Sequence, residues 1–249
     1  MSARATWQLF LGEVKLFLRE PFALFFTLAF PVILLLLFGS VYGSLPVENG
    51  YRFIDVYVPS LFAMVLANLG LMNIPITLAD YREQGIFKRY QVTPLPAWAL
   101  LLIQILVNSA MFLVSAALVL VVARLLFDLR FGGNLLFILV ALLISMAALF
   151  AGGFAIGGLT PGVRTAQTAG SAIFFVMFFS SGAAIPRGEF PEWLRRITDY
   201  VPLTHVVDTL SGLWINEPIG KYWLSLLMLA LIAVAAGVIA SRTFRWQAG

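Results

Sequence analysis

The chain has 249 residues, of which 61% are hydrophobic and 11% are charged, with a formal net charge of +4 and no cysteine. A soluble domain usually carries about 25% charged residues, so this chain has too few polar side chains to cover its surface in water, and its composition indicates an integral membrane protein. The scattered basic residues do not indicate nucleic-acid binding, and without cysteine the chain has no disulfide, thiolate metal site or thiol redox motif.

The first 20 residues predict an amphipathic helix. Apolar residues recur at helical spacing over residues 6–20, and polar residues occupy the opposite side. The apolar face consists of Trp7, Phe10, Leu11, Val14 and Leu18. We expect this helix to lie in the membrane interface, before Pro21 begins the first span. The alternative is an N-terminal extension of that span.

Six apolar runs follow, each close to or above the roughly 20 residues that a helix needs to cross the hydrocarbon core. They lie at 22–43, 57–79, 98–126, 134–159, 166–185 and 222–241. Pro31, Pro59 and Pro75 are compatible with helices here, because neighbouring helices can satisfy the freed backbone groups. We expect one membrane domain over 1–249. Its parts are an interfacial helix at 1–20, spans one and two at 22–79, a charged segment at 80–97, spans three to five at 98–185, an external connection at 186–221, and the last span with its tail at 222–249.

The distribution of Lys and Arg between the loops predicts the orientation. If both termini are cytoplasmic, the inner side carries nine basic and four acidic residues, and the outer side carries seven basic and eight acidic ones. This small bias favours cytoplasmic termini. The charged segment at 80–97 then also lies on the cytoplasmic side.

Several spans contain uncharged polar residues, which hydrocarbon penalises. In spans two and five they are Asn68, Asn73, Thr77, Gln167, Thr168 and Ser171, and span three contains Gln104 and Asn108 on one helical face. We expect the first six to line a path for an amphiphilic substrate. The alternative is a set of hydrogen bonds between helices, each contributing about 1 kcal/mol or less. No span has a charge near its centre, which argues against a proton- or sodium-coupled carrier.

Known catalytic motifs are missing from the sequence. There is no phosphate-binding G-x-x-x-x-G-K-[ST] loop and no cluster of residues that predicts a metal site. The single histidine, His205, together with Ser180 and Ser181, leaves an intramembrane hydrolase as a weak alternative. In span four, Gly153 and Gly157 form a small-xxx-small face, which predicts close helix packing within one copy or across a dimer.

The connection at 185–221 predicts two short helices bent at a proline. The first begins at Pro191 and has an apolar face containing Trp193, Leu194 and Ile197, and the second runs from about Leu203 to Leu213. We expect them to form a partly re-entrant hairpin on the outer side, where non-helical backbone must be buried in protein or line a wet cavity.

Two segments of the sequence resemble segments of one known family. The first, "REQGIFKRYQVTPLPAWALLLIQIL" (82–106), resembles the cytoplasmic loop and following span of ABC transporter permeases of the second type, in particular of their daunorubicin-resistance-like branch. It matches at Glu83, Gly85, Ile86, Arg89, Thr93, Pro94 and Leu95, and departs at Gln84, where a basic residue is commoner. "FFSSGAAIPRGEFPEWLRRITDYVPLTHVVDTLSGLW" resembles the external hairpin, with Ser211 in place of a frequent Arg.

The resemblance implies an all-α membrane protein of type V ABC exporter architecture. It has six transmembrane helices, an N-terminal interfacial helix, a cytoplasmic coupling helix and an external re-entrant hairpin. Two permease copies pair as a homodimer, and separate ATPase subunits bind ATP and Mg²⁺, so this chain itself binds no cofactor and no metal. The coupling residues are Arg82, Glu83, Gly85, Ile86, Lys88, Arg89 and Pro94, in a helix over 82–92. The alternative is a solvated loop.

These features predict the permease of an ATP-driven exporter of drug-like or lipid-like molecules in a prokaryotic cytoplasmic membrane, with membrane lipids as further partners. The external hairpin is the expected gate, with Pro186, Pro191, Trp193, Pro202, His205 and Asp208 as gate residues. Alternatives are a permease for polysaccharide or lipid-linked glycan and, more distantly, an ATP-independent scaffold or the hydrolase.

Overall fold

The computed structural model describes residues 3–47, 50–86, 97–185 and 187–243, which are mostly helical and contain no β-strand. The α-helices are α1 (Ala3–Phe17), α2 (Pro21–Leu24), α3 (Phe30–Tyr42), α4 (Phe53–Ala67), α5 (Ile74–Glu83), α7 (Ala97–Phe127), α8 (Leu135–Leu159), α9 (Val163–Ser180), α10 (Glu192–Thr198), α11 (Pro202–Trp214) and α12 (Trp223–Thr243). Two π-helical segments, η1 (Phe25–Ala29) and η3 (Asn68–Asn73), join α2 to α3 and α4 to α5, and two 3₁₀ turns are η4 (Arg187–Glu189) and η5 (Ile219–Lys221).

Five helical stretches among the described residues are long and apolar enough to cross a membrane: Pro21–Tyr42, Phe53–Glu83, Ala99–Phe127, Leu135–Leu159 and Trp223–Thr243. They correspond to five of the six predicted spans. The sixth prediction, 166–185, falls on α9, which is less apolar because its first half carries Arg164, Gln167 and Thr168. The helix also ends at Ser180, because Gly182 adopts a φ of +92° and turns the chain away.

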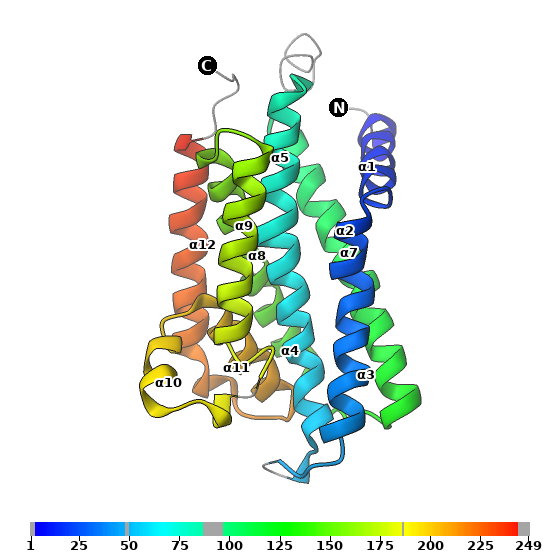
Figure 1. Ribbon diagram of the computed structural model, residues 1–249, viewed down its shortest axis with the longest axis vertical. Coiled ribbons are helices and arrows are strands. Elements are labelled where there is room, and N and C mark those ends of the chain that lie inside the picture. The colour runs from blue at the N-terminus through cyan, green and yellow to red at the C-terminus, as the bar shows by residue number, and fades with distance from the viewer. Residues whose placement is uncertain (1–2, 48–49, 87–96, 186, 244–249) are drawn as a thin grey trace.

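The helices run alongside one another and give the bundle two distinct ends (Figure 1). The charged segment at 80–97, which we call the insert, begins at one end of the bundle. This insert end also contains α1, the α8–α9 turn and the end of α12. The other, the hairpin end, contains α10, α11 and the α3–α4 and α7–α8 connections. The predicted topology likewise places the helices near the two termini on the same side as the charged segment.

The stretch α4–η3–α5 is the centre of the bundle. It is 83% buried along its most apolar window, against 11% to 33% for the other four membrane-length stretches. It packs against α3, α7, α8, α9 and α11. A displacement of this central stretch would therefore change its packing contacts with most of the other helices.

Both π-helical segments end two residues before a proline, Pro31 and Pro75 respectively. Proline has no N–H to donate, and its ring crowds the carbonyl four residues earlier, so the helix widens locally instead of breaking. For Pro31 that carbonyl belongs to Thr27, and the Ser115 hydroxyl of α7 donates to it. The neighbouring helix thus satisfies the group that the proline leaves free, as the sequence predicts for intramembrane prolines.

Glycines of α8 and α9 pack directly on the backbone of η3. A Cβ at Gly153 would lie 1.9 Å from the Gly70 carbonyl oxygen, and one at Gly170 would lie 2.4 Å from that of Leu71. Leu71 is four residues before Pro75, so its carbonyl also lacks the usual α-helical donor. The predicted glycine face of span four thus packs against the central stretch of the same chain.

Candidate functional site

The charged insert begins inside α5 and not in a helix of its own. Arg82 and Glu83 form the last turn of α5, whereas the sequence predicted that they begin a separate helix over 82–92. Gly85 adopts a φ of +65°, which an L side chain rarely tolerates, and Ile86 packs partly buried against the core. The predicted coupling residues Lys88, Arg89 and Pro94 lie outside the described residues.

The Arg82 guanidinium caps the end of α8. Its Nη1 donates to the Thr160 carbonyl at 2.6 Å, and its Nη2 donates to the Gly157 carbonyl at 2.7 Å. The last carbonyls of a helix have no partner within the helix and carry the negative end of its dipole, so a cation there is stabilising. The planar fork of Arg suits two acceptors in parallel.

The Glu83 carboxylate caps the start of α9. Its Oε1 accepts a hydrogen bond from the Val163 backbone N–H at 2.8 Å. Val163 is the first residue of α9, where unpaired N–H groups and the positive end of the dipole favour an anion. A Cβ at Gly162 would lie 2.5 Å from Oε1, so a larger residue at that position would require the end of the Glu83 side chain to shift.

The six predicted path residues do not share one surface. Asn68 is 3% exposed, and its Oδ1 accepts from the Thr27 hydroxyl at 3.2 Å, so it is closed to a substrate in this conformation. Thr77 donates within its own helix, to the Asn73 carbonyl. Gln167 and Thr168 are exposed on α9, with Ser171 half-buried one turn further along. Three of the six therefore lie on α9, and three lie within the central stretch.

Asn73 belongs to a chain of polar contacts that runs across α5, α7 and α1. Its Nδ2 donates to Asn108 Oδ1 at 2.8 Å, and Asn108 in turn donates to the Gln104 carbonyl at 2.8 Å. The Gln104 amide donates to Glu13 Oε2 at 2.9 Å and to the Tyr81 hydroxyl at 2.8 Å. Burial raises the pKa of Glu13, although hydrogen bonds from Tyr81 and Gln104 oppose the shift. These contacts attach α1 to the bundle.

The predicted gate residues divide between contacts and free surface. Pro186 lies outside the described residues, and Pro191 and Pro202 stand at the starts of α10 and α11. Trp193 is 65% exposed. The side chain of His205 contacts Ser225 of α12, with 3.1 Å between Nδ1 and Oγ.

Arg187 holds the hairpin together, a role that the sequence analysis did not assign. Its Nη1 donates to Asp208 Oδ2 at 2.8 Å, and its Nη2 contacts Asp199 and donates to Thr198 Oγ1 at 3.3 Å. Burial raises the pKa of Asp208, and the charges of Arg187 and His205 oppose this. The available signal was a cation just before two predicted short helices, with acids at Glu192, Asp199 and Asp208 following it in the sequence.

The hydrolase alternative requires Ser180 or Ser181 beside His205. Ser180 instead donates to the Val176 carbonyl at 2.6 Å, and Ser181 donates to the Phe178 carbonyl at 3.3 Å. Both hydroxyls serve their own helix, and the histidine contacts Ser225. The structure does not bring the predicted nucleophile and base together.

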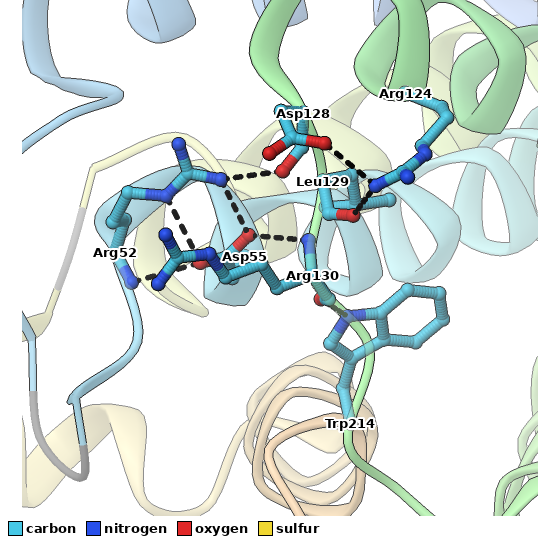
Figure 2. Close-up of polar contacts among 7 residues, drawn as sticks. All are labelled: Arg52, Asp55, Arg124, Asp128, Leu129, Arg130 and Trp214. Carbon is cyan, nitrogen blue, oxygen red and sulfur yellow. Dashed lines mark hydrogen bonds and ion pairs between the residues drawn. The ribbon is translucent and has the colours of Figure 1, made fainter.

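A second network that the sequence analysis missed surrounds Asp55 at the hairpin end (Figure 2). Asp55 is fully buried, and it accepts hydrogen bonds from the Arg52 backbone N–H at 2.9 Å and from the Arg130 backbone N–H at 2.8 Å. Arg52 Nη2 donates to the Asp128 carbonyl at 2.6 Å, and Trp214 Nε1 donates to the Arg130 carbonyl at 3.1 Å. The network joins α4, the α7–α8 connection and α11. The signal was an acid three residues after a helix start, the position of a capping-box acceptor.

A cavity of about 770 Å³ opens beside this network, between α7 and α8. Its lining is mainly apolar and includes Phe62, Phe112 and Trp214, with Arg124 among the few charged residues. None of the six predicted path residues lines it. Among the described residues, no group of three or more His, Asp or Glu side chains is placed to hold a metal ion.

Comparison with known proteins places these features in a family. Residues 4–215 match the family described as ABC-2 type transporter. The chain is 27% identical over 193 residues to a protein named "Probable multidrug ABC transporter permease YbhR" from Escherichia coli K12, covering 76% of this chain and 51% of the relative. It is 28% identical over 224 residues to ycf38 of Cyanophora paradoxa, a transport permease by name, covering 83% of this chain and 74% of that protein. The chain thus spans about half the length of YbhR.

Proposed function

Since the chain belongs to the ABC-2 type transporter family, we propose that it is the membrane-spanning permease subunit of an ATP-driven exporter. ATP and Mg²⁺ are bound on a separate nucleotide-binding subunit, because this sequence has no phosphate-binding loop. The observation that carries the proposal is the extent of the family match. It runs from α1 to the end of α11 and so covers the charged insert as well as most of the bundle.

In this proposal α9 is also a span, the fifth of six along the chain. Its 18 residues are about 27 Å long at 1.5 Å per residue, close to the roughly 30 Å of hydrocarbon. Its second half is apolar, and its polar first half lies at the insert end beside the α8–α9 turn. The insert end faces the cytoplasm of a prokaryotic cell, in agreement with the basic bias of the loops.

Two copies pair, and the substrate passes between them along α9. The outward side of α9 remains exposed in one copy, with Val176 68% and Phe179 56% exposed. Thr168 continues this exposed side toward the insert end, and Gln167 is exposed next to it on another face of the helix. A mostly apolar wall with a few uncharged polar groups suits a drug-like or lipid-like amphiphile. The name of YbhR, a multidrug permease, supports this substrate class. The hairpin, which Arg187 holds together through Asp199 and Asp208, is the outer gate.

The proposal is tested by co-expressing the chain with candidate nucleotide-binding subunits from the same genome and purifying the complex in lipid nanodiscs. We expect the subunits to copurify and amphiphilic drugs to stimulate ATP hydrolysis. A hydrolysis-deficient nucleotide-binding subunit is the control, which should copurify but not respond. If the wild-type chain retains no nucleotide-binding subunit in the membrane, the exporter assignment is wrong.

A further inference from the structure

We infer that Arg82 and Glu83 form a clamp that makes the end of α5 and the α8–α9 turn move together. This inference rests on the proposed function, and it changes the predicted role of both residues. The sequence placed them on the surface that a nucleotide-binding subunit contacts. The structure directs both side chains toward backbone groups of their own chain, 75 to 80 positions away.

The clamp joins two helix ends that carry opposite partial charges. The Arg82 cation takes the unpaired carbonyls at the end of α8, and the Glu83 anion takes an unpaired N–H at the start of α9. Each charge therefore lies at the helix end whose dipole it complements. Because the two residues are adjacent in α5, a displacement of that last turn pulls on both helix ends at once.

Two of the five N–H groups of Arg82 are engaged within its own chain. Nη1 and Nη2 both donate to carbonyls, and Nε is buried without a partner in the described structure. Glu83 remains exposed, but its Oε1 is taken by Val163. The two residues therefore act as positioning residues within this chain.

A second level of contact lies deeper in the bundle. About 20 Å from Glu83 along the central stretch, the backbone of η3 touches Gly153 of α8 and Gly170 of α9. The central stretch thus holds both helices at two separated levels. A push on the end of α5 cannot leave α8 and α9 behind unless the clamp opens. This gives a physical route from the insert to α9, the helix proposed to line the path.

The test compares Glu83→Ala and Glu83→Gln. Glutamine keeps an oxygen that can accept from the Val163 N–H but removes the charge, whereas alanine removes both. We expect Glu83→Ala to lower drug transport at least tenfold while the nucleotide-binding subunit copurifies at the wild-type level. Glu83→Gln should stay within about threefold of wild type. If Glu83→Gln loses transport as fully as Glu83→Ala, or if both variants lose the nucleotide-binding subunit on purification, Glu83 acts as a charged contact and the clamp is wrong.

Gly162→Ala tests the clamp from its other side without touching Glu83. Its Cβ would displace Oε1, so it should reproduce the transport loss of Glu83→Ala, whereas Gly12→Ala, with open space around it, should leave transport unchanged. Spin labels at Gln84→Cys and Thr165→Cys add a direct readout in this cysteine-free chain. The distribution of distances between the two labels should stay narrow through the ATP cycle when Gly162 is present, and it should broaden in Gly162→Ala. Unaltered distances and transport in Gly162→Ala overturn the inference, and a wild-type chain that binds no nucleotide-binding subunit overturns the proposed function instead.

Discussion

At the start of α4, the fully buried carboxylate of Asp55 accepts hydrogen bonds from two backbone N–H groups and contacts the Arg52 guanidinium. Removing one partner from a buried, charge-assisted network leaves the others unpaired and costs about 3 kcal/mol. We therefore expect Asp55→Ala to lower the midpoint of thermal unfolding in detergent micelles by several degrees. Asp128→Asn is the matched control, because it removes the charge of the solvent-exposed pair with Arg124 and keeps a residue type that tolerates the positive φ of 49° at this position, so it should change the midpoint little. Equal midpoints for the two variants would show that the Asp55 network does not stabilise the hairpin end.

Glu13 makes the stability of the folded protein depend on pH. Its folded-state pKa is raised above the ordinary value of 4.5, chiefly by burial, so between those two pKa values the folded protein holds more protons than the unfolded chain. Stability then falls as the pH rises from about 4.5 through the folded-state pKa. We expect the unfolding midpoint of the wild type to decline over that range relative to Glu13→Gln, which has no charge to lose. Parallel pH profiles for the two proteins would contradict a raised pKa.

At the scale of the element, the glycines of α8 offer a test between neighbours. A Cβ at Gly153 would collide with the Gly70 carbonyl at 1.9 Å, whereas a Cβ at Gly152 would meet Leu71 Cδ2 at an ordinary 3.6 Å. Both changes to alanine raise helix propensity by a similar amount, roughly 1 kcal/mol. We expect Gly153→Ala to lower the unfolding midpoint and Gly152→Ala to leave it equal or slightly higher. Chemical denaturation in the same micelles provides the measurement, and equal shifts would mean that α8 does not pack this closely on η3.

The sequence predicts where the spans lie, but it does not predict the contacts between residues that are distant in the chain. Hydropathy is a local property, so the first span, expected at 22–43, was found at Pro21–Tyr42. The second was expected at 57–79 but runs from Phe53 to Glu83. The longer stretch takes in charged residues near both ends, and Asp55, Arg82 and Glu83 find partners elsewhere in the chain. Those partners lie 75 to 80 positions away, which no local pattern reveals.

The candidate site was predictable to the same degree. The insert could be located, because its charges and glycine stand out between two apolar runs, and its family resemblance was correct. The side to which Arg82 and Glu83 turn could not be predicted, since it depends on how α8 and α9 meet. Arg187 and Asp55 escaped notice for the same reason: each is an ordinary surface-type residue until the fold surrounds it with acceptors or donors.

On the scale of the whole molecule, the two ends of the bundle carry different polar networks, and the proposed function assigns them to opposite sides of the membrane. The clamp and the Glu13 contacts lie at the insert end, and the Arg187 and Asp55 networks lie at the hairpin end. Energy from ATP hydrolysis would have to enter at the first and act on the second. The continuous central stretch from Phe53 to Glu83 joins them, since it contributes residues to both.

This arrangement predicts which end of the molecule a reagent reaches from outside the cell. The chain has no cysteine, so single cysteines at Tyr200, which is 81% exposed at the hairpin end, and at Thr165, exposed at the insert end, report on one position each. We expect a membrane-impermeant maleimide to label Tyr200→Cys on intact cells and Thr165→Cys only after the membrane is opened. The wild-type chain is the unlabelled control. The reverse pattern would put the clamp outside, where no ATP-hydrolysing subunit operates, and labelling of both sites on intact cells would contradict a single orientation.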